Sequence, residues 1–339
     1  MYNTIGELTA LAGVSGREEP VRNHLLARLE GLCSTSVDSL GSVIAFKKGK
    51  TAPKNKILIS AHMDEVGFII TYIEENGLLR FAPVGGIDSR LAAGKALKIG
   101  DRGVPGVIGC KAVHQQSGDE RDKALSFEEL YIDIGASSRE EAMTLVRLGD
   151  TAIFDTGFSA FGDGMLRGRA LDDRAGCALL LHLLEQELEY DLTASFTVME
   201  ETGCQGAAAV ANRVQPQIAI VLETTTASDI PGVSPEKQVC HLGRGPVLSF
   251  MDRGTVYDRE LYQTALELAR QEGIPCQSKA GVYGGNEARN FQTAACGARV
   301  LAISLPCRYI HSPACVLNRA DLESTARLLK ALIPKVANL

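Results

Sequence analysis

The chain has 339 residues, of which 45% are hydrophobic and 22% charged, with a net charge of −6 and nine cysteines. Because it holds no basic run, no apolar stretch of about 18 residues and no N-terminal signal pattern, we expect no nucleic-acid partner, no membrane span and a cytoplasmic location. The odd cysteine count, without a Cys-x-x-Cys pair, predicts reduced thiols rather than a disulfide framework.

The first 66 residues predict two helices and a strand. The apolar spacing over Ile5–Glu30 is helical, and Ser15 and Glu18 have the spacing of a capping box before the second helix. The short apolar run Ile57–Ser60 predicts a buried strand that ends just before His62. His62 is therefore expected at the edge of a sheet.

Residues 67–161 have a different pattern. Many glycines separate six short strand-like runs, and one helix, Ser138–Val146, interrupts them. The runs are Phe68–Ile73, Leu78–Phe81, Ala96–Ile99, Val104–Ile108, Glu129–Ile134 and Thr151–Phe154. Short strands with glycine turns predict an inserted all-β, barrel-like domain.

Beyond residue 165 strands and helices alternate. The expected strands are Ala194–Val198, Ile218–Leu222, Val247–Phe250 and Ala298–Ser304, and the expected helices are Ala175–Glu189, Ala207–Val214, Arg259–Gln271 and Arg319–Ile333. This alternation predicts an α/β fold with a mixed sheet covered by helices on both faces. We therefore expect one α/β domain, residues 1–66 plus 162–339, split by the insertion at 67–161.

His62 is one of only six histidines in the chain. Asp64 follows it by two residues, where its carboxylate can hold the second ring nitrogen of a metal-bound imidazole. A hydrogen-bonded histidine at a strand end would give the same pattern, so this pair alone leaves both interpretations open.

Two pairs of adjacent carboxylates come later in the chain. Asp172 and Asp173 precede the helix that begins near Ala175, so they either cap that helix or hold cations at a sharp turn. Glu200 and Glu201 end an apolar strand, where two carboxylates repel each other unless a cation lies between them or one is protonated. One could bind metal while the other accepts a proton, although an ordinary polar loop would look the same.

Two further candidates follow predicted strands. Glu223 ends the strand Ile218–Leu222, and His311 follows the strand Ala298–Ser304 and a short loop. Because the carboxyl ends of strands in an α/β sheet meet at one edge, we expect all of these side chains to converge. The resulting set of two histidines and three carboxylates is sufficient for a pair of divalent ions, with Glu200 left over as a base: His62, Asp172, Glu201, Glu223 and His311.

Together these motifs resemble the dinuclear metallo-aminopeptidases of the tetrahedral, self-compartmentalising type, whose members are also labelled glutamyl or deblocking aminopeptidase, or cellulase M. The matching segments run in order across nearly the whole chain: Ala61–Gly67, Gly168–Arg174, Glu200–Ala207, Asp229–Gly232 and Arg308–Pro313. The resemblance implies a zinc-peptidase-like fold and hydrolysis of N-terminal residues from short peptides. It also implies that residues 67–161 are a dimerisation domain and that the dimers build a dodecamer.

The resemblance also implies the ligands of each ion. Asp172 would bridge two divalent ions, which we expect to be Zn or Co. His62 and Glu223 would complete the shell of one ion, and Glu201 and His311 that of the other. A water activated by both ions would attack the peptide carbonyl.

The same resemblance makes Glu200 the general base, and Asp64 the residue that orients His62.

Two positions depart from the family pattern. Glu223 stands where relatives often carry aspartate, and the usual Gly-Gly-Thr-Asp loop reads Gly284–Glu287. The second departure leaves the preferred substrate side chain open.

Two other functions are compatible with parts of the pattern. A glycoside hydrolase would use Glu200 and a second carboxylate without metal, but the chain has only 5% aromatic residues and no tryptophan for a sugar cleft. A non-catalytic metal-binding assembly protein would have no use for Glu200. His-Glu-x-x-His and Gly-x-Ser-x-Gly motifs are both missing from the sequence, which argues against zincins and α/β serine hydrolases.

Overall fold

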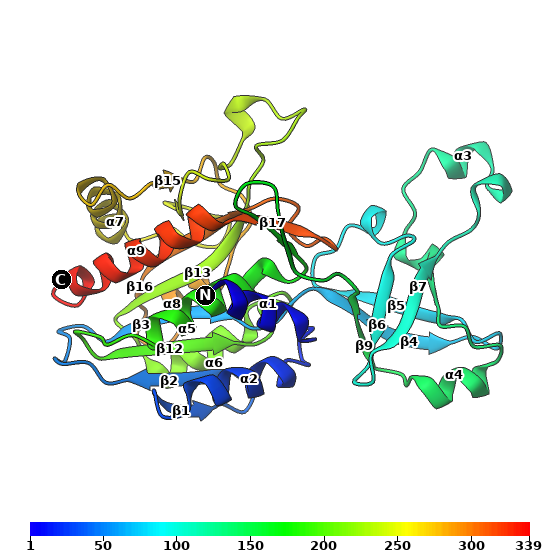
Figure 1. The fold of residues 1–339 in the computed structure, drawn as a ribbon, viewed down its shortest axis with the longest axis horizontal. Helices are drawn as coiled ribbons and strands as arrows, with labels where there is room; N and C mark the ends of the chain where they lie inside the picture. The colour runs from blue at the N-terminus through cyan, green and yellow to red at the C-terminus, as the bar shows by residue number, and fades with distance from the viewer.

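The computed structural model describes residues 1–339, apart from the side chain of residue 120. Helices and a large sheet form one part of the molecule, and a closed barrel stands to one side of it (Figure 1). The predicted α/β fold with an all-β, barrel-like insertion is therefore confirmed. Among the described residues, no helix is both long and apolar enough to cross a bilayer.

The large sheet has eight strands in the order β1-β2-β12-β3-β13-β16-β14-β15. The four central strands, β12, β3, β13 and β16, run parallel, and β2 and β14 flank them in the antiparallel direction. Parallel central strands bring their carboxyl ends to one edge of the sheet. The strands are β1 Ser34–Val37, β2 Val43–Lys47, β3 Ile57–His62, β12 Leu192–Thr197, β13 Ile218–Thr226, β14 Val247–Leu248, β15 Gln277–Ser278 and β16 Arg299–Cys307.

Helices cover both faces of this sheet. These helices are α1 Tyr2–Ala10, α2 Glu19–Leu29, α5 Leu171–Leu184, α6 Gln205–Val214, α7 Arg259–Gln271, α8 Ala288–Thr293 and α9 Arg319–Val336, whereas α3 Gly118–Arg121 and α4 Arg139–Leu145 belong to the insertion. Helices α1, α2, α5, α7 and α9 share the larger apolar core on one face, and α6 and α8 pack on the other. Buried Leu261, Ala265 and Leu268 on α7 show the helical spacing that places one apolar stripe against the sheet.

The barrel closes in the order β4-β5-β8-β7-β6-β9. Its strands all lie within residues 67–161: β4 Gly67–Ile73, β5 Leu79–Val84, β6 Ala96–Ile99, β7 Val104–Gly109, β8 Tyr131–Asp133 and β9 Thr151–Phe154. Phe68 lies at the centre of its core, where its ring meets Phe81 edge-on at 5.1 Å and Phe154 at 5.2 Å between centroids. The chain returns to the α/β part through a three-stranded sheet of β10 Ser159–Phe161, β11 Met165–Gly168 and β17 Cys315–Asn318.

The predicted capping box before α2 is wrong. Glu18 is the residue before the helix, and no side chain caps the first turn of α2. The Ser15 hydroxyl instead donates to Asp64 at 2.6 Å, and Glu18 accepts from the backbone N–H of Gly16 and of Met199. Contacts with residues far along the chain outcompete the local cap, and both side chains are directed toward the carboxyl edge of the sheet.

Candidate metal centre

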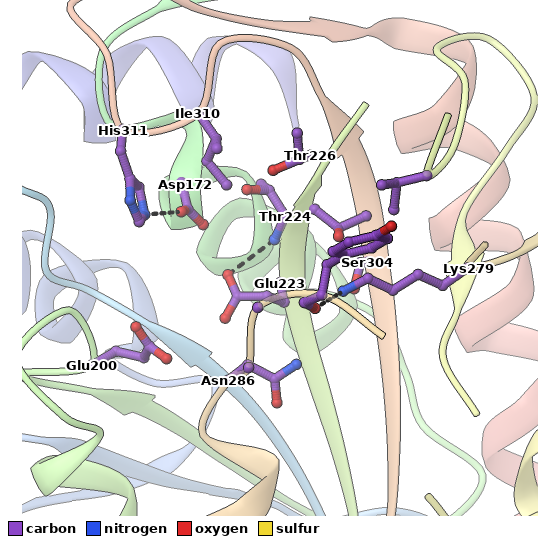
Figure 2. A pocket seen from close by; sticks show the side chains of 15 residues that line it. Asp172, Glu200, Glu223, Thr224, Thr226, Lys279, Asn286, Ser304, Ile310 and His311 are labelled. Carbon is purple, nitrogen blue, oxygen red and sulfur yellow. Dashed lines mark hydrogen bonds and ion pairs between the residues drawn. The ribbon is translucent and has the colours of Figure 1, made fainter. Parts of the chain in front are cut away.

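The carboxyl edge of the parallel strands brings the predicted side chains together (Figure 2). His62 is the last residue of β3, Glu200 and Glu201 follow β12, and His311 lies in the loop after β16. Glu223 lies inside β13 rather than at its end, because the pairing of β13 with β16 continues to Thr226. Side chains from three of these segments, Glu200, Glu223 and His311, line one cavity, and the buried His62 lies against Glu223.

Asp172 reaches this edge from a different direction. It follows β11, a strand of the small sheet, and begins α5. The expectation that every candidate ends a strand of one sheet is therefore wrong for Asp172. Its carboxylate nevertheless lies between the two histidines, with Oδ1 3.6 Å from His62 Nε2 and Oδ2 3.1 Å from His311 Nε2.

The remaining two carboxylates each accompany one histidine. Glu223 Oε1 lies 3.4 Å from His62 Nε2, and Glu201 Oε2 lies 3.1 Å from His311 Nε2. Ligand atoms of His62, Asp172 and Glu201 lie within 4.8 Å of one another. Asp172 thus lies between two pairs that each consist of a histidine and a glutamate.

The donor set fits divalent cations for a second reason. Asp172 Oδ1 and Glu201 Oε1 are buried and make no hydrogen bond with the described residues. A buried carboxylate oxygen without a donor is costly unless a cation or another donor satisfies it. Imidazole nitrogen with carboxylate oxygen is a ligand combination that suits Zn, Co and Mn.

Asp173 is also close enough to His62 and Glu223 to be considered as a ligand. Its Oδ1 accepts from Gly176 N–H at 3.0 Å, and its Oδ2 accepts from His62 N–H at 3.3 Å. Both oxygens are thus occupied by backbone donors, and the side chain is fully buried. Among the described residues, by contrast, Asp172 Oδ1 has no hydrogen-bond donor. The peptide bond between Asp172 and Asp173 is cis.

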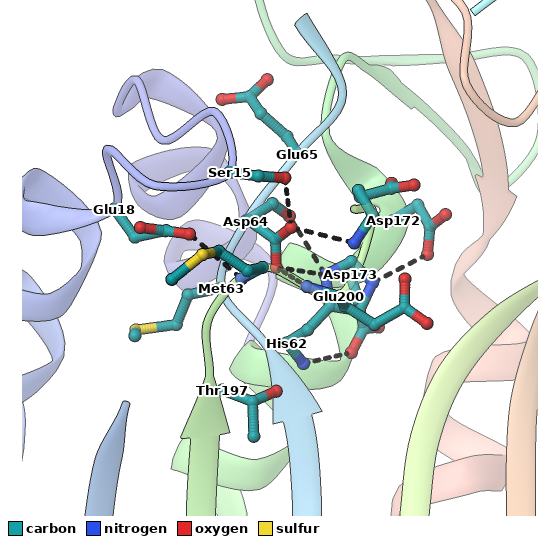
Figure 3. A network of polar contacts seen from close by, with 12 residues as sticks. Ser15, Glu18, His62, Met63, Asp64, Glu65, Asp172, Asp173, Thr197 and Glu200 are labelled. Carbon is teal, nitrogen blue, oxygen red and sulfur yellow. Dashed lines mark hydrogen bonds and ion pairs between the residues drawn. The ribbon is translucent and has the colours of Figure 1, made fainter. Parts of the chain in front are cut away.

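Asp64 lies behind His62 and connects the segments around it (Figure 3). His62 Nδ1 lies 3.1 Å from the Asp64 carbonyl oxygen and 3.3 Å from its carboxylate, which leaves Nε2 to face Asp172 and Glu223. The Asp64 carboxylate also accepts from the backbone N–H of Glu200 at 2.9 Å and of Glu201 at 3.1 Å. The side chain expected to orient His62 therefore also fixes the backbone of both glutamates.

The charges of the cluster depend on one another. Although burial favours the neutral imidazole, hydrogen bonds to Asp172 and Glu201 raise the pKa of His311 to about 11. Burial raises the pKa of the Glu200 carboxyl to about 8, and Glu201 adds to the effect by repulsion. Burial likewise raises the pKa of Glu223. Cations at this position would favour the ionised carboxylates and the neutral imidazoles that ligation requires.

Several residues at the site were not found by the sequence analysis. In the loop 284–287, whose sequence departs from the family pattern, Asn286 lines the cavity. Glu287 instead points beneath the site and accepts a hydrogen bond from the Thr197 hydroxyl at 2.6 Å. Gly85 and Gly86 of the barrel approach Glu201 and His311 so closely that an added Cβ would lie 3.2 Å and 3.4 Å from them. A paired glycine in a β-rich insertion carries no chemical signal, so only the fold identifies this contact.

Comparison with known proteins places this fold and site in a family. Residues 41–328 match the family described as M42 glutamyl aminopeptidase. A putative aminopeptidase of Acetivibrio thermocellus is 36% identical over 97% of each chain, and the lysyl aminopeptidase of Pyrococcus furiosus is 31% identical over 96% of this chain and 94% of its own. The TET1 peptidase of Pyrococcus horikoshii, which can assemble into a tetrahedron or a large octahedral shell, superposes with a TM-score of 0.87 at 34% identity over 97% and 98% of the two chains.

The chain therefore belongs to the M42 aminopeptidase family, and it is a metal-dependent aminopeptidase. This assignment favours the peptidase over the glycoside hydrolase that the sequence left open. It leaves the number of ions, the role of each residue and the preferred substrate to be argued from the site itself.

The burial of Glu18 beside the site predicts a pH-dependent stability. Glu18 is 3% exposed, and its burial raises its pKa from 4.5 to about 7. The folded state therefore holds this proton more tightly than the unfolded state, so the stabilisation is present below pH 4.5 and is lost as the pH rises toward 7. Glu18→Gln keeps the acceptor oxygen but cannot ionise. Its free energy of unfolding should exceed that of the wild type at pH 8, by up to about 3 kcal/mol.

Urea unfolding at pH 5 and pH 8 measures this difference. Glu19→Gln, a change to the exposed neighbouring carboxylate, serves as the control and should show no comparable gain at pH 8. If Glu18→Gln and the wild type differ equally at both pH values, the buried carboxyl does not titrate in this range.

Proposed function

We propose that the site binds two divalent ions and hydrolyses the first peptide bond of short peptides. Asp172 would bridge the ions, because its two oxygens face His62 and His311 separately. Glu223 would join His62 at one ion, and Glu201 would join His311 at the other. The position of Asp172 between two histidine and carboxylate pairs is the observation that carries this proposal.

Divalent ions at such a site acidify water and polarise the substrate carbonyl. The protein's own part in the reaction centres on Glu200, which lines the same cavity of about 250 Å³ as Asp172, Glu223 and His311. Its carboxylate accepts a proton from the attacking water and returns it to the leaving amine. Asp64 fixes the backbone of Glu200 and the ring of His62, so the base and a ligand keep one relative position.

The cavity also indicates which first residue the enzyme prefers. Lys279 lines it at 8% exposure, and its ammonium donates to the Tyr283 carbonyl at 2.8 Å, which is its one hydrogen bond to the described residues (Figure 2). Thr224 lines the same cavity, and its hydroxyl is buried without a partner. Burial lowers the pKa of Lys279, although the carboxylates of Asp252 and Glu223 oppose this effect.

A buried ammonium and a free hydroxyl beside a peptidase centre are suited to a carboxylate. We therefore propose that peptides beginning with glutamate or aspartate are the preferred substrates. A relative that is 31% identical, from Pyrococcus furiosus, is a lysyl aminopeptidase, so we infer the preference of this chain from its own cavity and not from sequence similarity.

We also propose that residues 67–161 form a dimerisation domain and that twelve chains assemble into a hollow particle. One cavity on the barrel is lined by three large side chains that are exposed by 48%, 60% and 63%, namely Tyr72, Met143 and Leu148. Adjacent exposed apolar side chains of this size are typical of protein interfaces. The solved TET1 peptidase of Pyrococcus horikoshii can assemble into a tetrahedron or a large octahedral shell, which supports a large assembly of this chain.

The first prediction concerns the base. Glu200→Gln keeps the shape of the side chain but cannot accept a proton, so kcat should fall by about 10²–10⁴-fold. Elemental analysis should find two divalent ions per chain in both the variant and the wild type. Near-normal turnover of the variant would place the base elsewhere, and a single ion in active wild-type protein would contradict the dinuclear centre.

The second prediction concerns the substrate. Lys279→Met should lower kcat/KM for a glutamyl p-nitroanilide by about 10- to 100-fold, because a charge-assisted hydrogen bond is lost, while a leucyl substrate should be affected little. Lys330→Met removes the same charge from the exposed face of α9 and is the control. An equal loss on both substrates would show that Lys279 supports the fold rather than selecting an acidic residue.

The third prediction concerns assembly. Light scattering on the metal-loaded protein should give a mass near twelve times the 36.2 kDa chain mass. Met143→Asp places a charge in the proposed interface and should shift the protein toward smaller species, whereas Lys330→Asp on α9 should not. An active monomer at micromolar concentration would refute the assembly without affecting the catalytic proposal.

A further inference from the structure

Cys204 contacts the proposed base through both its backbone and its side chain. It precedes α6, one helical turn after Glu200, and adopts a left-handed backbone with φ of 61°. Its N–H donates to the Glu200 carbonyl at 2.9 Å, and its thiol donates to Glu200 Oε1 with a sulfur-to-oxygen distance of 3.2 Å. The two contacts hold the same residue at its main chain and at its carboxylate.

The turn that carries this thiol is itself fixed from another element. The Asn290 side-chain amide on α8 donates to the Cys204 carbonyl at 2.6 Å, and the neighbouring Arg289 guanidinium donates to the Gly203 carbonyl at 3.3 Å. The thiol is 4% exposed and packs within the apolar cluster that includes Ala207 and Phe291. The anchored turn and the surrounding apolar side chains therefore hold Cys204 with its sulfur directed at Glu200.

This contact matters because few other groups orient the Glu200 carboxylate. Among the described residues, the Cys204 thiol makes the one hydrogen bond to the Glu200 side chain. Asp64 fixes the Glu200 backbone but does not reach its carboxylate. A thiol is a weak donor, so it can hold one oxygen in place without competing strongly for the proton that the other oxygen must accept.

We propose that Cys204 is a positioning residue for catalysis, whose thiol holds Glu200 Oε1 so that Oε2 faces the attacking water. This inference rests on the proposed role of Glu200 as the general base. It gives a function to a cysteine for which the sequence predicted only a reduced thiol. The hydrogen bond of the Cys204 thiol goes to Glu200 and not to a proposed metal ligand. Substitution of Cys204 should therefore lower kcat and leave the metal content unchanged.

The test compares Cys204→Ala, which removes the donor, with Cys204→Ser, which replaces it by a hydroxyl of similar size. With the metal-loaded protein and a glutamyl p-nitroanilide, the alanine variant should lose about 3- to 10-fold in kcat, the effect of one hydrogen bond, with KM within twofold of the wild type. The serine variant should retain most of the wild-type kcat. Cys296→Ala, a change at an exposed cysteine, is the matched control and should behave as the wild type.

A double-mutant cycle separates positioning from a general structural role. In the Glu200→Gln background there is no base to position, so Cys204→Ala should cause no further loss of kcat. The inference is overturned if the alanine variant keeps full kcat, if serine is as damaging as alanine, if metal content falls, or if the loss is equal in both backgrounds. Full activity of Glu200→Gln alone would instead overturn the proposed base, and this inference with it.

Discussion

The buried carboxylate of Asp64 is the group on which the arrangement of the site depends. It accepts hydrogen bonds from the Ser15 hydroxyl and from the backbone N–H of Glu200 and Glu201, and it lies against the ring of His62. These donors come from the segment before α2, the end of β3 and the turn after β12. One fully buried anion thus holds three separate chain segments in fixed positions relative to one another. These segments lie close together only once the sheet has folded.

A second buried network supports the same edge from behind. Glu65 forms ion pairs with Arg169 and Arg174, and Arg174, which is fully buried, also donates to the Met63 carbonyl at 2.7 Å and to the Leu11 carbonyl at 3.2 Å. A buried ion pair gains little net stability, but removal of one partner leaves an uncompensated charge. The network therefore fixes how α1 and the start of α5 meet the end of β3, and with them the position of the Asp172 carboxylate.

The barrel contributes to the site without supplying a ligand. Its Gly85–Gly86 turn passes against Glu201 and His311, and a Cβ at Gly85 would lie 2.8 Å from Val66 and 3.2 Å from Glu201. Gly85 also has a φ of 80°, which residues with a Cβ adopt only at a cost. The same insertion that we propose as an interface thus closes one side of the metal centre, so that assembly and catalysis share a structural element.

The fold class, the β-rich nature of residues 67–161 and the cluster of His62, Glu201 and His311 could all be predicted from the amino-acid sequence, because strand and helix periodicities are local and strand ends meet at one edge of an α/β sheet. The sequence could not reveal that Asp172 arrives from a separate small sheet, or that β13 extends past Glu223. The apparent capping box before α2 was misleading for the same reason. Tertiary pairing decided these features, together with the thiol on Glu200 and the ammonium in the cavity. Each depends on contacts between residues distant in sequence, whose energies exceed the local preferences that a sequence pattern can express.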